Sequence, residues 1–277
     1  MRYKEIFISG TNTEVGKTFI TLNIIKFLES KGTRVNPYKP VETGCKKKSS
    51  ELIPHDSTLF YKAINKRIDL NQINPYRFVE PISPATAIKR SRRKIYIQNY
   101  SEKLKDLPSG DITLIEGAGG LCSPLASDGY NIDLIKKINA PTILVAKDEI
   151  GVINNVILSV NMLNKYKIKL LAIVLNRKAN SQPVGMDNYK EIKTLCKTPL
   201  IQILNKQHHN QREFNKLIKR PKLWNTYFLH EEKISLQLET FFLNNNKKLN
   251  LPRDWNCNAK EKLWLYNLHY FDDLNSF

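Results

Sequence analysis

Short runs of apolar residues recur along the first 204 residues, and most are followed by a segment whose apolar residues recur every three or four positions. The runs lie at residues 6–8, 34–38, 112–115, 142–146, 170–175 and 200–204. Continuous runs of this length predict strands buried on both faces, and the periodic segments predict helices. Strands that alternate with helices predict an α/β fold of three layers, with a mostly parallel sheet and helices on both faces.

The first predicted strand leads into a loop with the pattern of a phosphate-binding site. The strand breaks at Gly10, and the loop closes on Gly16-Lys17-Thr18 before a helical segment that continues through Phe19. Backbone N–H groups of such a loop, together with the helix N-terminus, bind a polyphosphate. Lys17 would contact the β- and γ-phosphates, and Thr18 would ligate Mg²⁺. Five residues separate the two glycines, where the common P-loop motif has four. The alternative is a strand–helix turn with an incidental lysine.

Polar residues follow other predicted strands, at the sheet edge where open α/β folds bind ligands. Lys39 and Thr43 lie in a turn bracketed by a proline and a glycine, where the alternative is an ordinary surface turn. Glu116 precedes a glycine-rich segment at 117–120. That arrangement suits a metal-site acid beside a γ-phosphate, or else a tight turn with an exposed acid. Asn176 could pair with an adenine edge or only cap a strand end.

Three further segments carry weaker signals. Asp56 opens a predicted helix, where its alternative to a metal site is an N-cap. The charged segment 88–107 predicts a surface helix and a turn. His208 and His209 are adjacent but have no acid at ligand spacing, which favours exposed histidines over a metal site.

The character of the chain changes after residue 205. Beyond residue 221 aromatic residues become frequent, and the alternation of strands and helices does not continue. We therefore expect a P-loop domain at 1–215 and an aromatic-rich appendage at 216–277.

Composition narrows the setting and the partners. The four cysteines are scattered without a Cys-x-x-Cys pair, and no secretory or membrane-spanning segment is evident, which predicts a cytoplasmic protein. The net charge of +18 raises the question of nucleic acid, but the basic runs at 46–48 and 89–94 lack interleaved aromatic residues. We expect a solvated basic surface that partly serves an anionic ligand, with no nucleic-acid or membrane partner.

Taken together and in order, these motifs over residues 1–204 resemble those of the ATP-dependent dethiobiotin synthetases. The matching segments are the phosphate loop 10–18, Lys-Pro-Val-Glu-Thr-Gly at 39–44, His-Asp at 55–56, the proline-containing connection 74–84, Glu-Gly-Ala-Gly-Gly at 116–120 and Val-Leu-Asn-Arg at 174–177. Three features depart from the family pattern, and one of them is the tail after about residue 215, which is foreign to the family. Ala85 stands where the family often has a histidine, and residues 201–205 replace a Gly-x-x-Pro ending, which predicts an altered adenine pocket. The segments at 252–256 and 263–272 weakly resemble an N-terminal part of heparinase II/III-like proteins.

The resemblance implies an ATP-dependent cyclo-ligase of biotin biosynthesis. 7,8-Diaminononanoate takes up CO2 as a carbamate, ATP phosphorylates the carbamate, and the second amine closes a cyclic urea with loss of phosphate. ATP and Mg²⁺ would be the cofactors. The resemblance also implies a homodimer whose interface completes the substrate site.

Each matched residue takes an implied role. Lys17 and Lys39 would be catalytic, because they would stabilise charge on the transferring phosphoryl group. The nucleotide would be bound by Thr13, Glu14, Val15, Gly16, Lys17, Thr18, Phe19, Asp56, Glu116, Gly117, Ala118, Gly119, Asn176 and Arg177. Mg²⁺ would be held by Thr18, Asp56 and Glu116. The diamine would be bound by Thr11, Lys39, Thr43, Gly151 and Asn154.

Three other interpretations remain open. A cobyrinate-amidating enzyme would carry a glutamine-hydrolysing domain with a nucleophilic cysteine, which the sequence lacks. A partition-type ATPase that binds DNA or membrane usually has a further lysine early in the loop, where this chain has Thr11 and Asn12. The third is a fused remnant that folds but no longer turns over.

Overall fold

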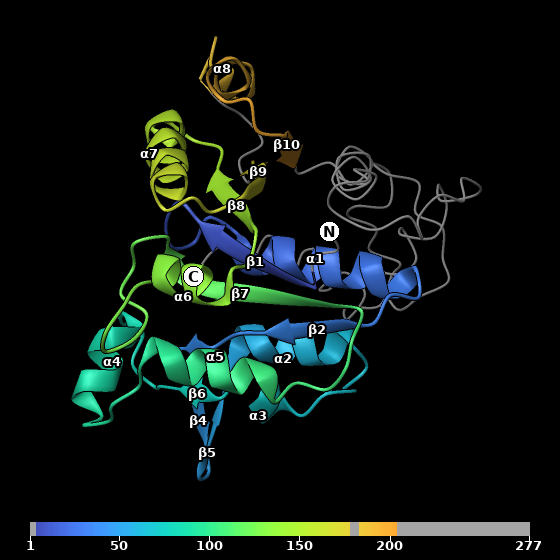
Figure 1. Ribbon diagram of the computed structural model, residues 1–277, viewed down its shortest axis with the longest axis vertical. Coiled ribbons are helices and arrows are strands. Elements are labelled where there is room, and N and C mark those ends of the chain that lie inside the picture. Colours follow the sequence, from blue (N-terminus) through green and yellow to red (C-terminus); the bar gives the residue numbers. More distant parts are fainter. Residues whose placement is uncertain (1–3, 178–182, 204–277) are drawn as a thin grey trace, which may run out of the picture. The chain divides into compact units, whose positions relative to one another are not determined.

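A six-stranded parallel sheet forms the centre of the part of the chain that the computed structural model describes, residues 4–177 and 183–203 (Figure 1). The strand order is β10-β9-β8-β1-β7-β2, and each neighbouring pair is parallel. The strands are β1 (Glu5–Gly10), β2 (Val35–Tyr38), β7 (Ile112–Gly120), β8 (Thr142–Lys147), β9 (Leu170–Asn176) and β10 (Leu200–Ile203). The predicted parallel sheet is confirmed.

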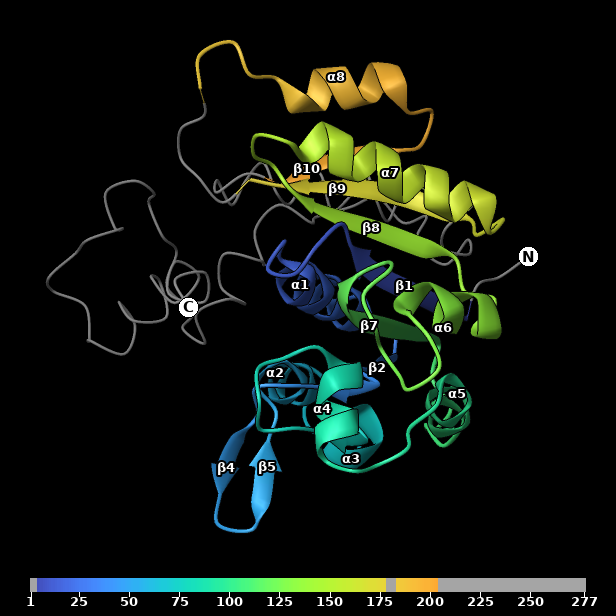
Figure 2. The same cartoon turned by 90° about the vertical axis from the view of Figure 1, so that its left-hand side faces the viewer.

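Helices cover both faces of this sheet and complete the three layers. They are α1 (Lys17–Ser30), α2 (His55–Ala63), α3 (Leu70–Ile73), α4 (Pro84–Arg90), α5 (Ile97–Lys105), α6 (Asn131–Ile138), α7 (Val152–Lys165) and α8 (Asn188–Leu195). The chain moves in one direction across the sheet from β1 to β2, and in the opposite direction from β7 to β8 and β9. Because such crossovers are right-handed, α1 lies on the opposite face from α6 and α7 (Figure 2).

Two small sheets flank the region after β2. β3 (Val41–Glu42) pairs in parallel with β6 (Tyr76–Arg77). β4 (Lys46–Lys48) and β5 (Glu51–Ile53) form an antiparallel hairpin that projects from the body (Figure 2). The sequence analysis did not predict this hairpin, because all three lysines of β4 are exposed and show no alternation of polar and apolar residues.

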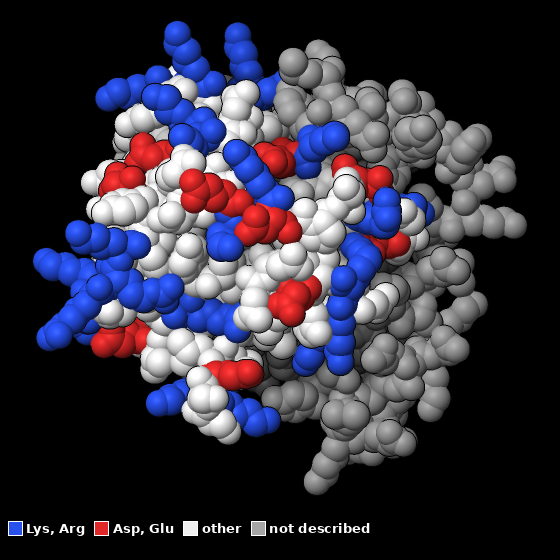
Figure 3. Space-filling model, turned by 60° about the horizontal axis from the view of Figure 1, so that its bottom comes forward, with Lys and Arg blue, Asp and Glu red and all other residues white. Residues whose placement is uncertain are grey.

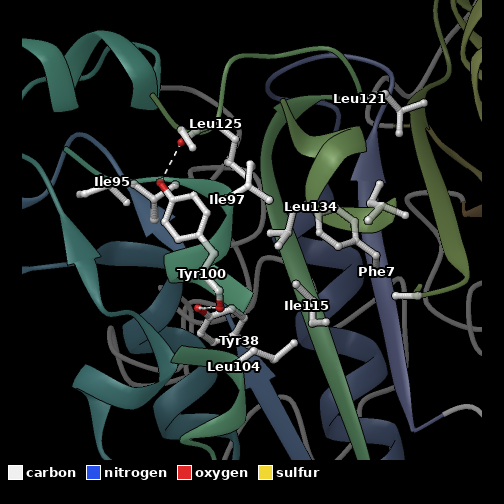
Figure 4. Close-up of a cluster of buried hydrophobic side chains, with 14 of the residues drawn as sticks. Phe7, Tyr38, Ile95, Ile97, Tyr100, Leu104, Ile115, Leu121, Leu125 and Leu134 are labelled. Carbon is white, nitrogen blue, oxygen red and sulfur yellow. Dashed lines mark hydrogen bonds between the residues drawn. The ribbon is translucent and has the colours of Figure 1, made fainter. Parts of the chain in front are cut away.

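The helix expected on the surface within 88–107 is confirmed as α5, whose outer face is exposed at Gln98, Glu102, Lys103 and Lys105, but its inner face is buried in the core. Tyr100 of α5 is fully buried: its backbone oxygen accepts from Tyr38 Oη at 2.8 Å, and its Oη donates to Leu125 O at 2.8 Å (Figure 4). Ile97 and Leu104 lie on the same buried face. Ile97, Tyr100 and Leu104 are spaced three and four residues apart, which places one apolar stripe within a charged segment.

A second apolar cluster lies at the other end of the sheet. Val152 and Val156 of α7 pack with Ile192 of α8 and with Ile173 of β9. Among the residues that the structure describes, no helix combines the length and the apolar character needed to cross a bilayer. The proposed domain boundary near residue 215 lies outside the described residues.

Candidate active site

The loop between β1 and α1 has the geometry of a phosphate-binding loop. A Cβ atom on Gly10 would lie 2.7 Å from Asn12 O and 2.8 Å from a methyl of Val15, so only glycine lets the loop close on itself. Gly16 caps α1 with a φ of +94°, a left-handed conformation that favours glycine. The buried Lys17 donates from Nζ to Asn12 O at 3.0 Å. The loop therefore places an ammonium group at the N-terminus of a 14-residue helix.

A cluster of one lysine and two acids lies beside this loop and joins three distant segments. Lys39, which follows β2, donates from Nζ to Asp56 Oδ2 at 2.7 Å and to Glu116 Oε1 at 2.5 Å. Thr18 Oγ1 donates to the same Glu116 oxygen at 2.9 Å. Thr21 Oγ1 donates to Glu116 Oε2 at 2.6 Å. The structure thus brings the predicted metal residues and Lys39 together.

The charges of this cluster depend on its burial. Burial alone would lower the pKa of Lys39, but the carboxylates of Asp56 and Glu116 outweigh it and raise that pKa above its ordinary value. Burial likewise would raise the pKa of Asp56, and the Lys39 ammonium holds it below its usual range. Lys17 differs, because burial lowers its pKa to about 8, only partly opposed by Glu116. Lys39 is thus the firmly charged cation of the pair.

Asp56 is not the N-cap of its helix. The cap position of α2 is Pro54, and Asp56 lies in the first turn with its side chain directed to Lys39. The buried Glu42 of β3 satisfies the helix end instead, accepting from Asp56 N at 2.8 Å, Ser57 N at 3.0 Å and Ser57 Oγ at 2.6 Å. A carboxylate at a helix N-terminus is favoured by both the free N–H groups and the helix dipole.

The glycine-rich segment after Glu116 is held by a residue that the sequence analysis did not select. β7 continues through Gly120, so the predicted strand end at residue 115 was wrong. The fully buried Asn131 donates from Nδ2 to Ala118 O at 2.7 Å and to Gly120 O at 2.9 Å, and accepts from Ala118 N at 3.2 Å. A Cβ on Gly117 would lie 2.3 Å from Asn131 Oδ1. The close approach explains why small residues are needed here.

Asn176, at the end of β9, contacts the phosphate loop directly. Its Nδ2 donates to Val15 O at 3.1 Å, and a Cβ on Gly16 would lie 2.1 Å from the same nitrogen. Arg177 follows, with Nε donating to Asp148 Oδ2 at 3.0 Å. Both predicted nucleotide residues therefore lie at the strand edge that carries the loop.

The remaining predicted residues lie at three separate places. Thr11, Thr13, Glu14 and Phe19 belong to the loop or the first turn of α1, and Thr13 and Glu14 are exposed. Thr43 is partly exposed just after β3. Gly151 and Asn154 are exposed at the start of α7, after β8. Because β1 and β7 lie between β8 and β2, the strand that precedes Gly151 and Asn154 is separated by roughly 14 Å across the sheet from the strand that precedes Lys39.

Three residues that order the site were missed for a common reason. Thr21, Glu42 and Asn131 each act through a hydrogen bond to a segment distant in sequence, and periodicity does not reveal such contacts. Glu42 lies inside a motif that was recognised, but its capping role depends on a helix 14 residues further on.

The parallel sheet, the glycine loop and the lysine at the start of α1 define a P-loop nucleoside-triphosphate-binding protein. A family model described as an AAA domain matches residues 4–213. The ATP-dependent dethiobiotin synthetase of Vesicomyosocius okutanii is 39% identical over 189 residues, covering 68% of this chain and 84% of that protein. The synthetase of Halalkalibacterium halodurans is 33% identical over 201 residues, covering 72% and 83%.

The chain therefore belongs to this AAA domain family and, within it, to the ATP-dependent dethiobiotin synthetases. Among solved structures, a putative plasmid partition protein from Borrelia burgdorferi bound to AMPPNP is similar at 14% identity and a TM-score of 0.45. That match covers 78% of this chain and 97% of the other.

Proposed function

We propose that this chain is a Mg²⁺–ATP-dependent cyclo-ligase that converts 7,8-diaminononanoate and CO2 to dethiobiotin. The observation that carries the proposal is the contact of Lys39 with both Asp56 and Glu116 beside the phosphate loop. It joins the family's substrate segment to the residues that would hold the γ-phosphate. The curated relatives described above bear the name of this synthetase, and the chain spans 84% and 83% of their lengths.

The chemistry divides into two transfers. One amine of the substrate adds to CO2 and loses a proton to give a carbamate. A carbamate oxygen attacks the γ-phosphorus of ATP, the P–O bond to ADP breaks, and a carbamic–phosphoric anhydride forms. The second amine attacks the carbonyl carbon, and the C–O bond breaks so that phosphate leaves. Lys17 and Lys39 would stabilise the phosphoryl oxygens during the first transfer, and a charged Lys39 would also hold the carbamate.

The residues present suit Mg²⁺, which prefers oxygen ligands and keeps several waters. Among the described residues no group of three or more histidines, cysteines or acids could hold a metal alone. Thr18 and Asp56 would act with Glu116, because Thr18 donates directly to Glu116 Oε1, and Asp56 accepts from the Lys39 ammonium that also contacts that oxygen. A bound Mg²⁺ would neutralise charge on the β- and γ-phosphates.

The substrate roles need a second copy of the chain. Lys39, Thr43 and Thr11 would bind the diamine near the γ-phosphate. Gly151 and Asn154 lie on the far side of two strands in the same copy, so we assign their role to a homodimer partner. The exposed Ile150 beside them, 78% accessible, suits such an interface.

A partition-type ATPase is the less supported alternative. The face drawn in Figure 3 carries a group of adjoining basic side chains at its left edge, with acidic side chains beside it, but the curated relatives bear the name of the synthetase. The absence of nucleic-acid and membrane partners, the cytoplasmic location and the division at residue 215 stay predictions.

The proposed function is tested by ADP release from the purified full chain. We expect release only when Mg²⁺, bicarbonate and diaminononanoate are all present with ATP. Lys39→Met should abolish product formation with only a modest loss of ATP binding, because Lys39 would contact the reacting oxygens and not the base. ADP release at an equal rate without the diamine would overturn the proposal.

A further inference from the structure

A buried carboxylate that the proposed reaction does not use lies beyond the phosphate loop. Asp148 immediately follows β8, and its side chain has no exposed surface. Its Oδ2 accepts from Arg177 Nε and from Gln202 Nε2, both at 3.0 Å. Its Oδ1 accepts from Asn188 Nδ2 at 2.8 Å. Side chains from the end of β9, from β10 and from α8 thus converge on one acid.

Backbone contacts fix the register of β8, β9 and β10 at their carboxyl ends. Lys147 of β8 is opposite Asn176 of β9, which is opposite Ile203 of β10. Asp148 N donates to Asn176 O at 2.9 Å, and Arg177 N donates to Ile203 O at 2.9 Å. Asp148 therefore fixes, through both its backbone and its side chain, the short segment that carries two predicted nucleotide residues.

That segment is interlocked with the phosphate loop. The amide of Asn176 donates to Val15 O, and the absence of a Cβ on Gly16 makes room for it. A shift of the end of β9 would move this amide off the loop.

The direction of a bound nucleotide can be inferred from the strands on either side of β1, with β7 and β2 on one side and β8, β9 and β10 on the other. Glu116 and Lys39, which lie on β7 and after β2, would contact the γ-phosphate. The α-phosphate and the base of an extended triphosphate would then point the opposite way, toward β9 and β10.

We propose that Asp148 is a positioning residue for the base end of the nucleotide, acting through Asn176 and Arg177 and without touching the ligand. The proposal rests on the nucleotide site of the proposed function. Gln202 shares this role, which gives a use to the segment where the chain departs from the family's Gly-x-x-Pro ending. A buried carboxylate needs fixed hydrogen-bond partners, so the cluster has one favoured arrangement.

Direct binding of ATP and of ITP, measured by calorimetry on the full chain, tests the proposal without relying on product formation. Asp148→Asn keeps the size of the side chain but removes the negative charge to which Arg177 and Gln202 both donate. We expect its affinity for ATP to fall about tenfold, its preference for ATP over ITP to shrink, and kcat at saturating ATP to stay within about twofold of the parent.

The matched control is Asp133→Asn. Asp133 accepts from Tyr130 N at 2.8 Å at the start of α6 and is not one of the hydrogen-bond partners of Asp148, which are Arg177, Asn188 and Gln202. It should leave both nucleotide affinities unchanged. Because Asp148→Asn could fail to fold, Gln202→Leu removes a single donor and should weaken ATP binding about threefold with the same loss of base preference.

Folded variants that bind ATP and ITP as the parent does would overturn the proposal. So would a loss of kcat with ATP affinity unchanged. If the parent makes no dethiobiotin while its ATP affinity still depends on Asp148, the synthetase assignment fails and the positioning role stands.

Discussion

Lys17 and Lys39 are two buried ammonium groups in one site. The acidic residues around each of them determine which one stays protonated. Lys39 contacts two carboxylates, which keep its pKa above the ordinary value. Lys17 donates to a neutral carbonyl, and burial lowers its pKa to about 8. In the nucleotide-free protein, Lys17 therefore loses its proton at mildly alkaline pH.

We expect ATP affinity to fall as the pH rises above about 8, since the phosphates require the charged Lys17. In the limit the fall is about tenfold per pH unit. Lys17→Arg keeps its charge and should remove this fall, which calorimetry at several pH values would show. An affinity for ATP that is constant from pH 7 to 10 in the parent would contradict the assignment.

The same shift has the opposite sign for stability. Between pH 8 and the ordinary lysine value of 10.5, the unfolded chain binds more protons at this residue than the folded chain does. The contribution of Lys17 to the free energy of unfolding therefore rises with pH across that window in the absence of nucleotide.

The proposed metal site makes a paired prediction. Asp56→Asn and Glu116→Gln each remove one charge at nearly constant shape, so each should raise the Mg²⁺ concentration for half-maximal activity. Magnesium titration of the steady-state rate measures this. Parent-like behaviour of Asp56→Asn would remove Asp56 from the site.

At the scale of elements, the packing of β3 against the start of α2 determines where Asp56 lies. Glu42 accepts hydrogen bonds from two backbone N–H groups and one hydroxyl of that helix turn. Glu42→Ala should lower the free energy of unfolding by about 1–3 kcal/mol, because buried donors lose their partner. Denaturant unfolding measures the change. Glu80→Ala, on an exposed side chain, is the control. Equal midpoints for the two variants would argue against the cap.

Gly10, Gly16 and Lys17 could be placed in advance, because the loop geometry is local and needs those residue types. The hairpin β4–β5 and the buried face of α5 could not, since exposed lysines and a charged segment hide the pattern. Asp148 carried the same signal as Glu116, an acid at a strand end, and was missed because its partners lie 29 and 54 residues away.

At the scale of the whole molecule, the parallel sheet brings the ends of β1, β2, β7 and β9 to one edge and so joins residues from four parts of the sequence. Over the described residues, strands and helices alternate from β1, which begins at Glu5, to β10, which ends at Ile203, and together they build this sheet.

A chain cut after residue 215 should therefore fold and keep its midpoint of thermal unfolding within a few degrees. Gel filtration and thermal denaturation of the cut and full chains, side by side, measure this. An insoluble or non-cooperative cut chain beside a well-behaved full chain would place the appendage within the domain.

The carbamic–phosphoric anhydride is tested most directly by following the oxygen of CO2. In the proposed sequence the carbamate oxygen that attacks ATP leaves with phosphate when the ring closes. Brief reaction of the full chain with ¹⁸O-labelled CO2, ATP, Mg²⁺ and diaminononanoate should give phosphate that carries one ¹⁸O for each dethiobiotin formed. Phosphate without label, released while ATP is consumed, would mean that water attacks the nucleotide and would contradict the account.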